Sequence, residues 1–471
     1  MTSLALASLA FCEPIAGQEA ARSPGAESPL LTIGTALRLA LTRNPELLNT
    51  SDSLASSRWN ERAVRSTFLP QVTPFFAFEK SDETGERLDT YGLQLSQQFL
   101  FGTALEVQGV VDRQPQAPGG EAWTGDYRLT LRQSLLRGAD PAVTSEPLRL
   151  ARRSTSAQSR ALEITRRRTV LLVYQTYLGI ARQVEALKLA VDRAQRAQEL
   201  TSFSRARFSA GSVSRLDVLR AEQQEASSVV AKNDAENALE DFRDLLRRAA
   251  GLVENESFSI SMPLDLPVAE PDLVSAVEER MERRPEALEA RDQVTDAEFA
   301  LRIAKSLELP SVDGFLRYEA SGSGRSAGDA LHPRNPALVF GLSSQYGLNN
   351  TVLRARARQA EIELGVRKRN FLVLEDDLAR EVRRAYRSLD ALKRNHAIAV
   401  ENERVAELQA EVARLRFEKG LSDNFNVVDA ENLLNSARLL ELDSRVSILL
   451  ARLDCLYSSG WLDVNLFLDL P

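Results

Sequence analysis

Two long stretches of the chain lack proline and keep a helical spacing of hydrophobic positions. Residues 148–262 and 337–470 contain no proline. The natural breaks within them are Gly211 and Gly420, because glycine adopts turn geometry that other residues resist. At ~1.5 Å rise per residue, the first helix of each stretch would be roughly 100 Å long and the second about 55 Å. The pattern therefore predicts a long helix, a tight turn and a return helix twice, at 143–208 with 214–250 and at 352–417 with 423–459.

Shorter helices and alternating segments precede each long helix. Helical spacing predicts helices at 35–67 and 273–306. After them, apolar and polar residues alternate over about ten positions, which is typical of strands in a transmembrane barrel and also of an ordinary half-buried sheet. The clearest segments are 91–99, 127–136 and 338–345.

The two halves of the chain are copies of one another. Sequence matches recur at a constant offset of 240 residues through the first helix and strand, and of 209 residues around the helical turns. Chance does not hold a constant offset across so many positions, so the chain is a duplication. The matches include 44–46 with 284–286, 69–70 with 309–310, and 207–211 with 416–420.

The change of offset places an insertion in the first half. A fall from 240 to 209 means that the first half has 31 more residues in its β region, between Lys80 and about Tyr127. Segments 91–101 and 104–112 alternate there, whereas the second half has a Gly/Ser-rich loop at 321–336. Repeat one is therefore expected to carry an added β-hairpin, or a long loop, that repeat two lacks.

Composition agrees with long helices and excludes one class of partner. Of the 471 residues, 44 % are hydrophobic, 27 % charged and 6 % aromatic. Ala, Leu, Arg and Glu dominate, a mixture typical of long helices and coiled coils. The net charge of −7 comes from 66 acidic and 59 basic residues that are interspersed. Since no basic footprint exists, no nucleic-acid partner is expected.

The N-terminus resembles a secretory signal peptide. An apolar stretch at 4–11 and the following stretch at 16–20 resemble the hydrophobic region and the cleavage zone of a signal peptide, although no positive residue precedes them. Residues 9–12 are similar to a lipoprotein box, so lipidation of Cys12 is a second interpretation. No run of about 18 apolar residues follows, so a chain that entered a membrane would do so with β-strands.

No catalytic or metal-binding pattern is present in the sequence. The two histidines, His332 and His396, lie in no recognisable motif, and neither a phosphate-binding GxxxxGK[ST] loop nor HExxH occurs. Cys455 has no partner for an internal disulfide once the N-terminus is removed. We therefore expect a non-enzyme with no cofactor and no metal.

These features together resemble the TolC-like outer-membrane efflux protein family over about residues 31–466. The resemblance rests on the opening helix with Asn44-Pro45-Glu46, the strand start Phe68-Leu-Pro70, segment 207–222 around the first turn, and the closing Gly460-Trp461-Leu462. It implies a mainly α fold with β: duplicated long helical hairpins forming an α-barrel, plus four β-strands per chain contributing to a trimeric 12-stranded transmembrane β-barrel. Four strands cannot close alone, because single-chain barrels start at about eight.

The same resemblance implies the function. Members are passive exit ducts in the outer membrane of Gram-negative-type bacteria, with a long periplasmic part. They work as homotrimers and receive cargo from an inner-membrane transporter through a periplasmic adaptor, in tripartite efflux or type I secretion. A periplasmic coiled-coil scaffold or adaptor that never inserts in a membrane is the alternative.

The resemblance carries functional positions only at the turns. The hairpin tips are expected to contact the adaptor, although a simple glycine-broken turn would have the same sequence. The periplasmic entrance is expected one turn further on. There, three copies of Asp429 would form a ring that attracts cations, and Asn426 in place of an acid would weaken it; a solvated helix residue is the alternative. The tip residues are Gly211, Ser212, Val213, Gly420, Leu421 and Ser422, and the entrance residues are Asp217, Asn426 and Asp429.

The expected organisation follows from these assignments. It comprises a signal peptide at 1–20, a first repeat at 31–251, a linker or equatorial segment at 252–271, a second repeat at 272–462 and a C-terminal tail at 463–471.

Overall fold

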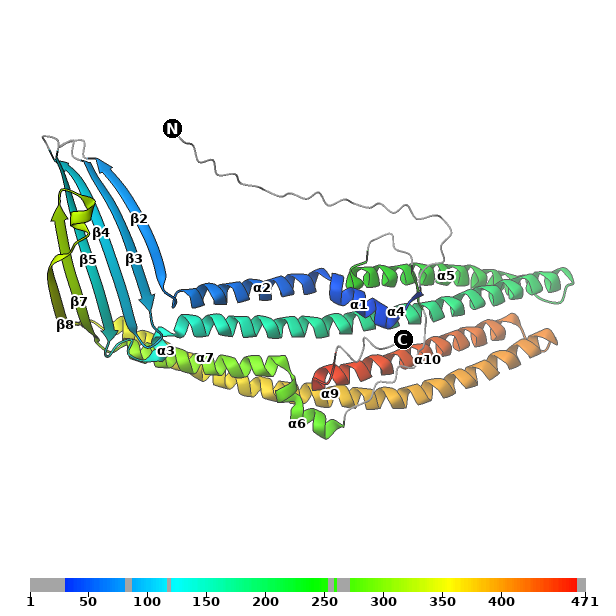
Figure 1. Cartoon of the computed structure of the whole chain (residues 1–471). Coiled ribbons are helices and arrows are strands. Elements are labelled where there is room, and N and C mark those ends of the chain that lie inside the picture. Colours follow the sequence, from blue (N-terminus) through cyan, green and yellow to red (C-terminus); the bar gives the residue numbers. More distant parts are fainter. Residues whose placement is uncertain (1–29, 81–86, 117–119, 253–257, 261–271, 464–471) are drawn as a thin grey trace, which may run out of the picture.

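The chain is elongated, with a curved sheet at one end and the turns of two helical hairpins at the other (Figure 1). The structure is a computed structural model that describes residues 30–80, 87–116, 120–252, 258–260 and 272–463. The expected signal peptide, with Cys12, lies outside the described residues, as do most of the linker and tail. None of the described helices is long and apolar enough to cross a membrane.

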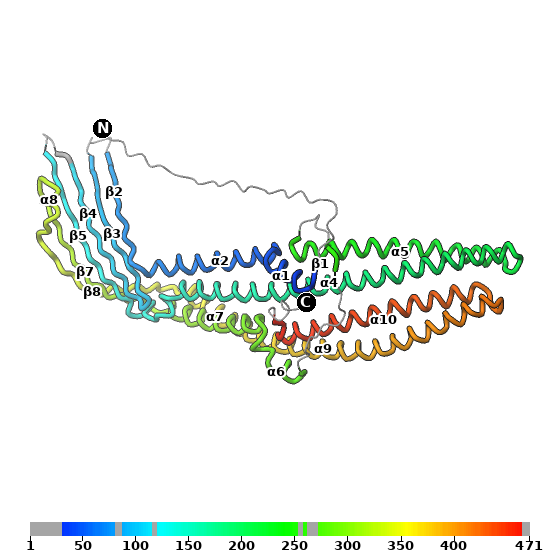
Figure 2. The backbone as a smooth tube through the Cα atoms, turned by 45° about the vertical axis from the view of Figure 1, so that its right-hand side comes forward, coloured from blue at the N-terminus to red at the C-terminus, as the bar shows by residue number. Residues whose placement is uncertain are grey.

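The two predicted helical hairpins are confirmed. The long helices α4 (Glu146–Ser209) and α9 (Thr351–Glu418) have 64 and 68 residues. Each turns back into a shorter helix, α5 (Arg215–Ala250) or α10 (Asn424–Ser459). The two hairpins lie side by side along the whole helical part of the molecule (Figure 2).

The helix expected before each β region is in fact two helices, so this prediction was wrong. The break falls where Pro45 and Pro285 follow Asn44 and Arg284, whose ψ angles are 122° and 121°. Proline disfavours a helical conformation in the preceding residue, and it has no amide hydrogen to continue the helix. The four helices are α1 (Ile33–Arg43), α2 (Pro45–Ser66), α6 (Leu273–Arg283) and α7 (Pro285–Leu307).

Each break is tied to the end of the return helix of the same repeat. Asn44 Nδ2 donates to the carbonyl oxygen of Ala249 over 2.9 Å, and Arg284 Nη1 donates to that of Ser458 over 3.1 Å. These two bonds are repeat-equivalent, since Ala249 and Ser458 occupy the same position in α5 and α10. As a result, α2 and α5 lie one after the other along α4, and α7 and α10 lie one after the other along α9.

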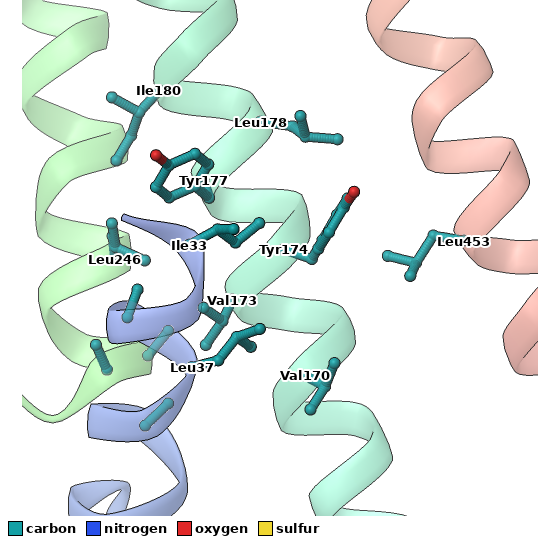
Figure 3. Packing of buried hydrophobic residues seen from close by; sticks show 14 of the residues in the cluster. Ile33, Leu37, Val170, Val173, Tyr174, Tyr177, Leu178, Ile180, Leu246 and Leu453 are labelled. Carbon is teal, nitrogen blue, oxygen red and sulfur yellow. The ribbon is translucent and has the colours of Figure 1, made fainter. Parts of the chain in front are cut away.

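The largest hydrophobic cluster lies at this same level of the molecule. Tyr174 on α4 is 1 % exposed, and Leu37, Leu246 and Leu453 on three other helices are equally buried. Figure 3 shows these side chains meeting between α1, α4, α5 and α10. The core therefore joins the first hairpin to the second at the middle of the rod.

The sheet has six strands among the described residues, all antiparallel, instead of the four per chain that the resemblance implied. Their order is β2-β3-β4-β5-β7-β8, which is also their order along the chain. The extra segment of repeat one is thus a hairpin, β3 with β4, inserted between β2 and β5. The strands are β2 (Gln71–Lys80), β3 (Arg87–Gln98), β4 (Thr103–Gln116), β5 (Gly120–Ser134), β7 (Ser311–Gly324) and β8 (Arg334–Gln345).

Two smaller features depart from the predictions. The segment expected to be a loop at 321–336 is partly strand, because β7 continues to Gly324 and β8 begins at Arg334, with the short helix α8 (Ala327–Ala330) between them. A parallel pair, β1 (Leu30–Leu31) with β6 (Ser259–Ile260), also lies beside the core. Both β1 and β6 are only two residues long, which is too short for an alternating pattern to reveal.

A ladder of ion pairs joins the two repeats between α4 and α7. Arg160 Nη1 lies 2.8 Å from Glu289 Oε2, and Arg153 Nε lies 2.9 Å from Asp296 Oδ2. Arg153 also pairs with Glu289. Burial raises the pKa of Glu289, but the hydrogen bonds and charge of Arg153, with a hydrogen bond from Arg160, outweigh this effect and hold the pKa below its ordinary value.

The conformation at Gly251 gives the first prediction. Its φ is +65°, and a Cβ added there would lie 2.7 Å from the carbonyl oxygen of Arg43. Gly251→Ala should therefore lower the free energy of unfolding by about 1–3 kcal/mol. Gly365→Ala, inside α9, should raise it by up to ~1 kcal/mol. Denaturant unfolding measures both changes, and equal effects of the two substitutions would contradict the described junction.

The ion-pair ladder gives a pH prediction. A carboxylate with a lowered pKa in the folded state stabilises the protein above its unfolded pKa, and this stabilisation is lost as the pH falls through the folded pKa. Glu289→Gln should therefore destabilise the protein at pH 7, and the difference from wild type should shrink towards pH 3. The control is Glu298→Gln, whose exposed pair with Lys368 contributes about 0–1 kcal/mol. Thermal unfolding across this pH range measures both, and a difference for Glu289→Gln that does not change with pH would contradict the assignment.

Candidate functional site at the hairpin tips

Both long helices end in the same left-handed turn. The φ angle is +72° at Gly211 and +74° at Gly420. The residue after each glycine donates its amide to the carbonyl five residues earlier, over 2.9 Å in both turns. Side chains rarely adopt this φ, so the helix end itself requires glycine here. The predicted tip residues thus form the two turns at the end of the molecule away from the sheet (Figure 1).

The predicted tip residues differ in exposure. Leu421 is 75 % exposed, although it is a large apolar side chain. Gly211, Ser212 and Gly420 are exposed as well, whereas Val213 and Ser422 are half-buried. Leu421 therefore leaves a single apolar side chain open to solvent at the end of the second hairpin.

The first return helix begins with a complete capping box. Ser214 Oγ accepts from the amide of Asp217 over 3.2 Å, and the Asp217 carboxylate accepts from the amide of Ser214 over 3.0 Å. The capping box satisfies two donors that the start of a helix leaves free. Asp217, which was predicted as an entrance residue, therefore caps the start of α5.

The second return helix begins differently. Asp423 is the cap of α10, and Asn426 takes the position that Asp217 has in the first repeat. The Asn426 amide donates to Ser422 Oγ over 2.9 Å and to Asp423 Oδ1 over 3.1 Å. Asp429 lies one turn further on and is exposed. Of the three predicted entrance residues, two are thus held in helix starts, and Asp429 is directed to solvent.

The two tips are joined to each other by hydrogen bonds that the sequence did not predict. Asn424 is fully buried, and its side-chain amide donates to the carbonyl oxygen of Asp217 over 3.0 Å. Arg207 Nη1 donates to the carbonyl oxygen of Phe417 over 2.7 Å. The Arg207 guanidinium also lies 5.4 Å from the ring centroids of Phe203 and Phe417. The two hydrogen bonds join residues more than 200 positions apart, so no local pattern could have revealed them.

A groove of about 470 Å³ lies between the hairpins just behind the tips. Its sides include the apolar side chains of Phe203, Phe417 and Val427. Across it, Arg196 Nε lies 3.0 Å from Glu431 Oε2. Burial lowers the pKa of Arg193 beside it. None of the described residues forms a group of histidines, cysteines and carboxylates suited to a metal ion.

Comparison with known proteins bears on the second repeat directly. Residues 276–454 match the sequence model of the outer membrane efflux protein family. This part of the chain belongs to that family. The match runs from α6 to α10, and it includes the second hairpin tip. No curated protein matches the sequence significantly.

Solved outer-membrane channels share the fold over almost the whole chain. VceC of Vibrio cholerae is 15 % identical with a TM-score of 0.71, and the match covers 91 % of this chain and 96 % of that one. CmeC of Campylobacter jejuni is 13 % identical with a TM-score of 0.69, covering 92 % and 87 %. MtrE of Neisseria gonorrhoeae, in its open state, is 16 % identical with a TM-score of 0.67, covering 91 % and 88 %. At these identities the likeness establishes the fold, and it extends to the first repeat.

The capping box gives a prediction that separates two of the predicted residues. Asp217→Ala should remove one side of the box and lower the free energy of unfolding by about 0.5–2 kcal/mol. Asp429→Ala should change it by less than about 0.5 kcal/mol, because the side chain is exposed. Hydrogen exchange at the first turn of α5 would locate the effect, and an equal loss in both variants would contradict the assigned roles.

Proposed function

We propose that this chain is the exit duct of a tripartite efflux or type I secretion system. The sheet crosses the outer membrane, and the helical hairpins reach through the periplasm towards a periplasmic adaptor and an inner-membrane transporter. Three copies form the duct. The observation that carries this proposal is the combination of a two-faced sheet with rods roughly 100 Å long in a chain whose second repeat belongs to the outer membrane efflux protein family.

The apolar face of the sheet supports insertion in a membrane. Phe76, Phe340 and Leu342 point to this face and are 73 %, 82 % and 73 % exposed in the single chain. So large an apolar surface is unfavourable in water and favourable against lipid. On the other face, Arg128 pairs with Glu319 over 3.1 Å, and Gln94 donates to Glu106 over 3.1 Å. Paired polar groups of this kind suit a water-filled interior.

The surface of the second hairpin supports an assembly of several copies. Val405, Leu408 and Val412 on α9 are 39 %, 49 % and 48 % exposed. They line a groove of about 480 Å³ that also includes Ser422 and Asn426 at the tip. A row of aliphatic side chains on one helix face is typical of packing against another helix. We infer that the neighbouring copy covers this face when the tube closes.

The tips support contact with a further protein. Leu421 and Leu216 are 75 % and 54 % exposed, one on each hairpin. A tube formed by three chains would present six such tips at its periplasmic end. Exposed apolar side chains at the rim of a tube are suited to the adaptor that connects it to a pump.

Conductance in planar bilayers tests the proposal. The purified protein should form trimers and conduct ions, and Asp429→Ala should raise the conductance and lower the preference for cations, because the exposed carboxylate narrows the entrance. Asp234→Ala, an exposed residue in the middle of α5, is the matched control and should leave both unchanged. A soluble monomer with silent bilayers would favour the periplasmic scaffold and overturn the channel.

A further inference from the structure

The inserted hairpin is part of the wall of the sheet and does not stand outside it. β3 pairs with β2 over ten residues, from Gln71–Ser96 to Lys80–Arg87, and β4 pairs with β5 from Thr103–Gln133 to Gln116–Gly120. β2 and β5 are therefore separated by two full strands. An extracellular loop would leave β2 bonded directly to β5, as β7 is bonded to β8 in the second repeat.

The cross-strand register gives the inserted strands the same two faces as the others. One row of directly opposed residues crosses all six strands and is apolar throughout. The next row, on the opposite face, is mostly polar. Because the apolar row continues across β3 and β4, the inserted hairpin is expected to face lipid as the other strands do. The first row is Val72, Leu95, Val107, Leu129, Tyr318 and Leu338, and the second is Thr73, Gln94, Gln108, Arg128, Glu319 and Ala337.

On the inserted strands, the outer limit of the apolar face carries aromatic and charged side chains, as expected at the boundary of a membrane. Phe78 and Tyr91 stack edge to face with ring centroids 5.9 Å apart. Asp89, directly opposite Phe78, is fully buried between Arg87, 2.7 Å away, and Arg113, 3.5 Å away. Aromatic side chains on the lipid-facing side of a barrel mark the level where lipid tails give way to headgroups. β3 and β4 supply most of this boundary.

The width of the sheet matches the width of the helical layer that feeds it. Next to the sheet, α2, α4, α7 and α9 pack in that order. Four helices at about 8–10 Å spacing span about 32–40 Å. Strands 4.8 Å apart and tilted by about 40° each take ~6.3 Å of circumference, so six strands span ~38 Å and four would span ~25 Å. The insertion therefore removes the narrowing that four strands per chain would produce.

We propose that three copies of this chain close an eighteen-stranded barrel, in which the inserted hairpins form one third of the wall. This inference rests on the proposed function for the number of copies. β2 and β8 are the outer strands of the described sheet and run in opposite directions, so β8 of one copy can pair with β2 of the next in the same antiparallel pattern.

The consequence is a wide outer opening. Eighteen strands give a diameter of ~36 Å between opposite backbones, against ~24 Å for twelve. The barrel then has about the same width as the helical tube beneath it. The exit suits bulky or polymeric solutes, because the membrane part does not restrict what the helical part admits.

Accessibility of single cysteines in the full chain tests the wall position of the hairpin. In outer-membrane vesicles, a membrane-impermeant maleimide should not label Leu93→Cys or Val107→Cys, which face lipid. It should label Gln94→Cys and Gln108→Cys, which face the interior. The native Cys455 is buried, and a Cys12→Ser background removes the other thiol. Labelling of both faces of the hairpin would overturn the inference.

Two controls on β8 separate this result from a failure of the proposed function. Leu338→Cys should be protected and Val339→Cys labelled if the sheet crosses the membrane at all. If Leu338→Cys is protected while Leu93→Cys is labelled, the channel stands and the eighteen-stranded wall is wrong. If both are labelled, the proposed membrane insertion itself is wrong.

Electron cryo-microscopy of the detergent-solubilised full chain gives the second measurement. A three-fold particle with eighteen strands is expected. A three-fold particle with twelve strands and the hairpin folded away would overturn the wider barrel. A two-fold particle with twelve strands would overturn the number of copies in the proposed function and the eighteen strands with it.

Discussion

The junction between a broken helix and the end of a return helix sets the shape of this molecule. In each repeat a proline interrupts the first helix, and the residue before it donates a hydrogen bond to the last turn of the return helix, from Asn44 to Ala249 and from Arg284 to Ser458. Because of these bonds, two shorter helices replace one another along a single long helix. The rod keeps two helices per repeat along its whole length, and the main hydrophobic core lies at the point of exchange.

Different side chains stabilise this junction in the two repeats. Asn44 is a short neutral cap that also accepts from the amides of Glu46 and Leu47. Arg284 is a buried cation, held by Glu286 and by Glu381 at 2.9 Å. Burial raises the pKa of Glu286, and the hydrogen bond and charge of Arg284 outweigh it and lower the pKa. The second junction therefore depends on charge and pH, whereas the first does not.

Much of this architecture follows from the sequence, because duplication and periodicity are local or repetitive signals. The offsets of 240 and 209 residues predict both repeats and the insertion, and glycine with an absence of proline predicts the hairpins. The helix breaks were missed because the helical spacing of apolar residues continues across Pro45 and Pro285. The bonds of Asn424 and Arg207 between the tips were missed as well, since they depend on how the two hairpins pack. The number of strands in the sheet could not be predicted, because an added hairpin and a long loop have the same length. Only the pairing of β3 and β4 distinguishes the two.

The open sheet has a consequence for how the protein is made. In a single chain the sheet has two unpaired edge strands, β2 and β8, and one exposed apolar face. The backbone hydrogen bonds of its helices join near neighbours in sequence, so the helices can form before other copies arrive. The backbone hydrogen bonds at the outer edges of β2 and β8 can form only when other copies of the chain pair with them. Assembly of several chains is thus the last step, because the helices can form within one chain and the sheet is completed only between chains.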